Sequence, residues 1–144
     1  MTKIAIIGSA LSGNKGAAAM LESSIQTLGE DTHFTLLSMY PREDAQQNPY
    51  KNLSIVKANP LELGIFINSW ALGYKLLPFA RNFIKRKSPA IKALSEADVL
   101  LDQGGITFVD GREKFLIYNV ASILPALMVG TPVVRCAQAL GPFK

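Results

Sequence analysis

The chain has 144 residues, of which 49% are hydrophobic and 18% are charged, and its formal net charge is +4. This length is enough for one domain with a substantial core, and the composition excludes a disordered chain. The modest positive charge permits an anionic partner but does not point to nucleic acid.

The chain is predicted to begin with a strand, a glycine-containing loop and a helix. The β-branched run that ends at Gly8 predicts a buried strand over residues 3–8 rather than a signal peptide. A loop follows over 9–16, and apolar residues spaced by four and three predict a helix over 17–28. The backbone N–H groups at the start of this helix would suit an anion or a polar sugar.

The glycines of this first loop do not match the known phosphate-binding motifs. Gly8, Gly13 and Gly16 are too widely spaced for the dinucleotide fingerprint. Asn14 occupies the position where a P-loop carries its lysine. The alternative to a ligand site is a tight turn that lets the helix pack closely on the sheet.

Two further strands are expected in the next third of the chain, over residues 33–39 and 53–57, with a polar loop over 41–52 between them. The only histidine, His33, lies at a strand entry, where we expect a surface or capping role.

A long helical region is expected over residues 61–87, which are apolar in the first part and basic in the second. A break is expected near Pro78. Glu62, Lys75 and Pro78 interrupt the apolar run, so it does not read as a transmembrane helix. Such a segment can lie in a membrane interface, but packing against the sheet with a solvated basic end is the favoured interpretation.

The last third of the chain continues the alternation of helices and strands. The expected elements are a helix over 88–96, a strand over 99–101, a helix over 112–129 kinked at Pro125, and a strand over 132–136. The single cysteine, Cys136, gives neither an intrachain disulfide nor a metal site, which favours a reducing, cytoplasmic compartment.

Alternating strands and helices predict an α/β fold, a Rossmann-like parallel sheet with helices on both faces. Polar and glycine residues follow three of the strands, within residues 8–16, 103–110 and 138–141. The carboxyl ends of parallel strands share one edge, so these segments are expected to meet there and form a site.

Three segments resemble the polysaccharide pyruvyl transferase family, in the family's order. They are Gly13-Asn14-Lys15-Gly16-Ala17, the Asp98–Gly105 stretch that ends in Gln-Gly-Gly with Asp110 following, and the stretch from Gly130 to Phe143 that ends in Gln-x-x-Gly-Pro-Phe. The chain departs from the family at Ala17-Ala18-Ala19, where many members carry an acidic residue, and at Ile106, where a third glycine is common.

The resemblance implies a two-domain, glycosyltransferase-B-like fold in which residues 1–144 form the N-terminal half. It implies transfer of the pyruvyl group of phosphoenolpyruvate, a co-substrate, onto two hydroxyls of a cell-surface saccharide as a cyclic ketal, with no further cofactor and no metal. Cations near the predicted edge are few, namely Lys15, Arg112 and Arg135. We therefore expect the donor to be held by a C-terminal domain beyond Lys144 and the acceptor by this half.

The expected acceptor-side residues are glycines and hydrogen-bonding side chains at the sheet edge: Gly8, Asn14, Lys15, Gly16, Gln103, Gly104, Gly105, Gln138 and Gly141. Asp110 is the candidate catalytic base, and its alternative role is a helix cap.

The alternative function is a non-catalytic Rossmann-like module that binds a nucleotide, a sugar or a partner subunit. A lipid-linked acceptor would bring residues 61–87 to the inner face of the membrane as a peripheral contact. A domain face left uncovered by a missing half would favour a homo-oligomer.

Overall fold

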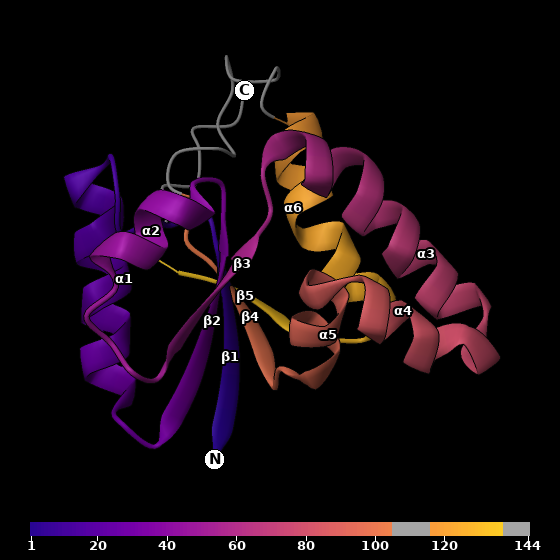
Figure 1. Cartoon of the computed structure of the whole chain (residues 1–144), viewed down its shortest axis with the longest axis horizontal. Helices are drawn as coiled ribbons and strands as arrows, with labels where there is room; N and C mark the ends of the chain where they lie inside the picture. Colours follow the sequence, from indigo (N-terminus) through magenta and orange to yellow (C-terminus); the bar gives the residue numbers. More distant parts are fainter. Residues whose placement is uncertain (105–115, 137–144) are drawn as a thin grey trace, which may run out of the picture.

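The computed structural model describes residues 1–104 and 116–136, which form a parallel sheet between two layers of helices (Figure 1). The strands within these residues are β1 (Thr2–Ile7), β2 (Thr32–Ser38), β3 (Leu53–Lys57), β4 (Val99–Asp102) and β5 (Val133–Arg135). They are hydrogen-bonded in the order β3-β2-β1-β4-β5, and every pair is parallel. The predicted α/β class and Rossmann-like parallel sheet are therefore confirmed.

The central strand β1 pairs with β2 on one side and with β4 on the other. Ile4, for example, lies opposite Phe34 of β2 and opposite Val99 of β4. The chain first adds β2 and β3 on one side of β1, then crosses back and adds β4 and β5 on the other side. The order of addition reverses between β1 and β4, and open α/β sheets bind ligands at the carboxyl ends of strands at such a reversal.

One helical layer consists of α1 (Lys15–Leu28) and α2 (Pro41–Gln47). Successive strand residues point to opposite faces, so Ile4 and Ile6 of β1 belong to the core under this layer. They cluster there with Leu21 of α1 and Phe34 of β2, and all four side chains are buried.

The prediction of a loop over 41–52 is wrong for its first part, because residues 41–47 form α2. Pro41 begins this helix, and Glu43 and Asp44 lie in its first turn, where carboxylates are favourable. The sequence did not predict this helix because its seven residues are mostly polar and form no apolar stripe. Its one buried residue is Asp44.

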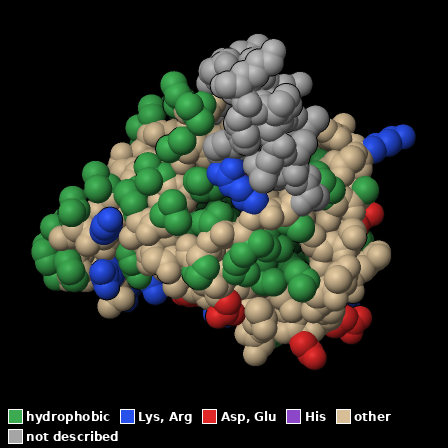
Figure 2. Space-filling view, turned by 180° about the vertical axis from the view of Figure 1, so that it is seen from behind, with side chains coloured by type: hydrophobic (Ala, Val, Ile, Leu, Met, Phe, Trp, Pro, Cys, Tyr) green, Lys and Arg blue, Asp and Glu red, His purple; other side chains and the backbone are tan. Residues whose placement is uncertain are grey.

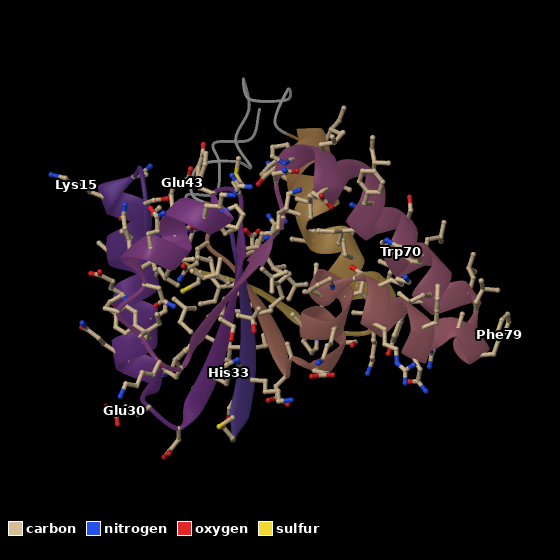
Figure 3. The ribbon with its side chains drawn as sticks, in the orientation of Figure 1. Lys15, Glu30, His33, Glu43, Trp70 and Phe79 are labelled. Atoms are coloured by element: carbon tan, nitrogen blue, oxygen red, sulfur yellow. The ribbon has the colours of Figure 1, made fainter. Side chains whose placement is uncertain are left out.

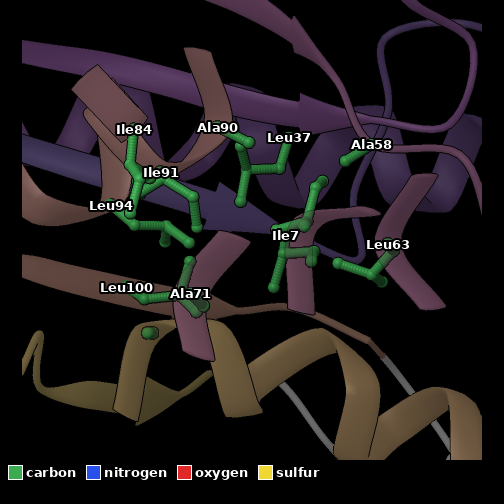
Figure 4. Packing of buried hydrophobic residues seen from close by; sticks show 13 residues of the cluster. Ile7, Leu37, Ala58, Leu63, Ala71, Ile84, Ala90, Ile91, Leu94 and Leu100 are labelled. Carbon is green, nitrogen blue, oxygen red and sulfur yellow. The ribbon is translucent and has the colours of Figure 1, made fainter. Parts of the chain in front are cut away.

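The other helical layer covers the opposite face of the sheet. It consists of the π-helical turn η1 (Glu62–Ile67), α3 (Asn68–Leu76), the 3₁₀ turn η2 (Pro78–Ala80), α4 (Arg81–Lys87), α5 (Pro89–Glu96) and α6 (Leu116–Val129). Figure 4 shows Ile7, Leu37 and Leu100 of the sheet packed against Leu63 and Ile91 of this layer. The prediction that residues 61–87 pack on the sheet is thus confirmed for the buried side of the segment.

The helical segment 61–87 breaks where the sequence predicts it. Leu77 leaves the helical conformation, with φ −120° and ψ 79°, because the residue before a proline is pushed out of the helical region. α6 contains Pro125, which is buried, and the predicted residues 112–115 lie outside the described part. Within the described residues, the structure contains no helix of the length and apolarity needed to cross a bilayer.

Candidate functional site

The carboxyl ends of β1 and β4 touch through two glycines. Gly8, which follows β1, has φ +80°, and a Cβ atom placed on it would lie 2.6 Å from both Cα and N of Gly104, which follows β4. Both the positive φ and the close backbone approach therefore require glycine at position 8. The structure brings these two predicted site residues together, and the close approach joins the ends of two strands rather than the helix and the sheet.

The loop after β1 ends at Asn14, which caps the N-terminus of α1. The Asn14 Oδ1 atom accepts hydrogen bonds from the N–H groups of Gly16 at 2.9 Å and of Ala17 at 3.3 Å. Asn14, Lys15 and Gly16 are all exposed. Figure 3 shows Lys15 projecting from the end of α1 nearest the carboxyl edge of the sheet. Three predicted residues thus gather at the positive end of the α1 dipole.

A buried carboxylate from α2 holds this loop in place. Asp44 Oδ1 accepts hydrogen bonds from the backbone N–H groups of Leu11 at 3.0 Å and Ser12 at 2.7 Å, and from the Ser12 hydroxyl at 2.6 Å. Its Oδ2 atom accepts from the Ser38 hydroxyl at the end of β2. Asp44 is fully buried. Its hydrogen bonds form a clamp that ties the loop both to α2 and to β2. Sequence reasoning missed it, because an aspartate in a polar stretch carries no signal of burial.

Gln103 is directed away from solvent. Its side chain is 1% exposed, and its Nε2 atom donates a hydrogen bond to the Ser24 hydroxyl of α1 at 2.7 Å. Its backbone N–H donates to the carbonyl of Ile7 at 2.8 Å. Among the described residues, its Oε1 atom has no hydrogen-bond partner. Gln103 therefore joins β4 to β1 and α1, and a contact between it and a sugar hydroxyl stays a prediction.

A second cluster lies on the β5 side of the same edge. Asp102, the buried last residue of β4, accepts a hydrogen bond from the N–H of Gly104 at 3.0 Å, and its Oδ2 atom lies 3.8 Å from Nε of Arg135. The Tyr118 hydroxyl of α6 donates to Sδ of Met39 at 3.2 Å. This edge therefore combines a carboxylate, a guanidinium and a phenol.

The electrostatics of this cluster disfavour ionisation of the phenol. Burial raises the pKa of Tyr118 above its ordinary value, and the negative charge of Asp102 and the neighbouring Tyr40 raise it further. The tyrosine is therefore a neutral hydrogen-bonding group at ordinary pH. Asp102 was not among the predicted site residues, although an aspartate that ends an apolar strand before a Gln-Gly pair is a usable signal.

Several predicted site residues lie outside the described part of the chain. These are Gly105, Asp110, Gln138 and Gly141, together with the nearby cation Arg112. Their predicted roles stay predictions.

Within the described ranges, the single histidine lies far from the site, and no group of metal ligands is present. His33 lies at the start of β2, at the opposite end of the strand from the site, and its Nε2 atom is 3.1 Å from the Ser54 hydroxyl (Figure 3). The surface role expected for it agrees with this position. In residues 1–104 and 116–136, no three His, Cys, Asp or Glu side chains are grouped so that they could hold a metal ion.

Comparison of the chain with protein-family models, curated proteins and solved structures found no match. The fold and the site thus define a Rossmann-like α/β domain with a polar, glycine-lined edge at its topological switch point.

Proposed function

We propose that this chain binds a saccharide at the carboxyl edge of its sheet and forms the acceptor half of a polysaccharide pyruvyl transferase. One observation carries the proposal. The Gly8–Gly104 contact joins the end of β4, in the Asp98–Gly105 segment that resembles the family, to the start of the loop that leads to Asn14 in another such segment.

The chemistry of this edge suits neutral polyol binding better than tight anion binding. Asn14 and Lys15 offer exposed polar groups, and the N-terminus of α1 offers a positive electrostatic potential. The described cation on the other side, Arg135, lies beside the carboxylate of Asp102, which offsets its charge. A saccharide with several hydroxyls matches this mixture of donors and acceptors.

In the proposed reaction, a sugar hydroxyl adds to the central carbon of phosphoenolpyruvate while its methylene carbon is protonated. Phosphate then leaves, and a second hydroxyl closes the cyclic ketal. This half would orient the two hydroxyls, and Asp110 remains the proposed base. Phosphoenolpyruvate carries a phosphate and a carboxylate, which call for Arg or Lys, and these would come from a second domain.

A second candidate is a binding module without catalysis. It is favoured by the way the described carboxylates at this edge are used: Asp44 is saturated with hydrogen bonds, and Asp102 is engaged by Gly104 and Arg135. Neither is arranged to accept a proton from a sugar.

The test measures phosphate release from phosphoenolpyruvate by the full-length protein with a panel of mono- and disaccharides. Asn14→Ser keeps an oxygen that can cap α1 but removes the amide donor, so we expect the KM for the saccharide to rise about fivefold, as for one lost hydrogen bond of about 1 kcal/mol. Gln26→Ala, an exposed amide on the same helix, is the matched control and should leave KM unchanged.

The outcomes separate the two candidates. An unchanged KM in Asn14→Ser together with unchanged turnover in Asp110→Asn would show that the site is wrongly placed. Saccharide binding that calorimetry detects and that weakens about fivefold in Asn14→Ser, without phosphate release by the full-length protein, would support the binding module.

A further inference from the structure

The α3–α4 hairpin ends in a protruding apolar tip. We define the tip by five exposed side chains: Leu72, Leu76, Leu77, Phe79 and Phe83. Phe79 is 86% exposed and Leu76 is 64% exposed. Figure 3 shows Phe79 at the extreme end of the molecule, pointing away from the body of the domain. Single exposed apolar residues are ordinary, but five within one hairpin form a patch.

The buried side of the same hairpin explains why the tip is exposed. Ala71 and Ile84 are buried in the core of this layer, and they orient α3 and α4 so that the opposite sides face solvent. A groove of about 440 Å³ lies between the two helices, with Leu77 and Phe83 of the tip among its lining residues. The apolar surface of the tip therefore continues into a groove that is also apolar.

The hairpin that carries the tip contains several cations and no acids. Residues 68–87 contain no Asp or Glu, and their basic residues are Lys75, Arg81, Lys85, Arg86 and Lys87. Arg81 lies over the ring of Tyr74 and Lys87 over the ring of Phe83, at 5.0 and 5.8 Å from the ring centres. In the part of the chain that the structure describes, the ion pairs involve none of these cations. Figure 2 shows Lys and Arg side chains beside the hydrophobic end of the molecule.

We propose that the α3–α4 tip docks on the surface of an anionic lipid bilayer. Phe79, Leu76 and their neighbours would enter the interface, and the cations of the same hairpin would contact lipid headgroups. A bilayer fits better than a protein partner because the charge is of one sign and lies beside an apolar tip, which complements a negative surface above an apolar interior. The proposal is independent of the proposed function, because it concerns residues of α3 and α4 that are not part of the proposed saccharide site.

The experiment is co-sedimentation of the chain with vesicles, without phosphoenolpyruvate or saccharide. We expect binding to vesicles of phosphatidylglycerol and phosphatidylcholine in equal parts, and much weaker binding to phosphatidylcholine alone. Trp70, the single tryptophan, packs against Phe83 with ring centres 6.4 Å apart, so its emission should shift to shorter wavelength on binding. This shift reports contact at the tip itself.

Matched substitutions separate insertion from general electrostatic attraction. Phe79→Ser should weaken binding at least about tenfold, as expected when one large apolar side chain is no longer buried. The control Ile117→Ser removes a side chain that is 82% exposed on α6 and should have no effect. Arg86→Gln should weaken binding about fivefold, whereas Lys51→Gln, which changes the net charge equally at a distant exposed site, should not.

Three results would overturn the proposal. The first is absence of binding by the native chain to the anionic vesicles. The second is equal binding by native protein and the folded Phe79→Ser variant, with folding checked by circular dichroism. The third is a dimer in sedimentation velocity that Phe79→Ser converts to a monomer, because the tip would then be an interface between copies of the chain.

Discussion

Asp44 offers the sharpest test of how the loop after β1 is held. Asp44→Ala removes the acceptor of four hydrogen bonds, from the N–H groups of Leu11 and Ser12 and the hydroxyls of Ser12 and Ser38. The two hydroxyls can rotate toward other acceptors, but the two backbone N–H groups cannot.

The magnitude follows from these groups. A buried donor left without a partner costs about 1–3 kcal/mol, so two buried N–H groups and the partial loss at the hydroxyls predict a destabilisation of about 3–5 kcal/mol. Asp44→Asn keeps one acceptor oxygen for the two N–H groups and should cost about 1–2 kcal/mol. Domains of this kind have a total stability of only about 5–15 kcal/mol, so the first change is severe.

The assay is urea unfolding followed by circular dichroism, which gives the free energy of unfolding and its dependence on denaturant. Glu43→Ala is the matched control, because Glu43 is an exposed carboxylate in the same turn of α2. It should cost less than about 1 kcal/mol, the value of a carboxylate near a helix N-terminus. Amide hydrogen exchange at Leu11 and Ser12 should accelerate in Asp44→Ala. A free energy within 1 kcal/mol of the Glu43→Ala value would refute the clamp.

Two further predictions concern the carboxyl edge. Gly8→Ala should cost about 3 kcal/mol, because positive φ costs an L-residue about 1–2 kcal/mol and the new Cβ would also meet Gly104 at 2.6 Å. Gly13→Ala, with φ +79° and nothing within 4 Å of the new Cβ, should show only the first cost, and equal losses in urea unfolding would contradict the contact. Because the pKa of Tyr118 is raised, the folded state binds the phenol proton more tightly than the unfolded state does. The resulting stability is complete below about pH 10, the ordinary tyrosine pKa, and is lost as pH rises through the raised value. Relative to the native protein, Tyr118→Phe should therefore show a smaller loss of unfolding free energy above about pH 10, whereas parallel curves would show that Tyr118 does not titrate in this way.

The local sequence pattern was sufficient for most of the fold. Short β-branched runs such as Ile4-Ala5-Ile6-Ile7 ending in glycine predicted buried strands, and their alternation with amphipathic helices predicted a parallel sheet with helices on both faces. Such a pattern records which side of an element is apolar, and in an α/β chain that is enough to choose the layers. The same pattern predicted that Gly8 and Gly104 lie at one edge of the sheet, where the structure shows them in contact.

The tertiary structure alone decided which partner each side chain meets. Asp44 and Gln103 look like solvent-facing polar residues in the sequence, yet both are buried because elements far apart in the chain close over them. Conversely, Leu76 belongs to the apolar part of the segment expected to pack on the sheet, yet it is exposed, because the hairpin's other side supplies the buried contacts. Periodicity assigns a face to a residue, but burial depends on what packs against that face, and only the folded chain determines it.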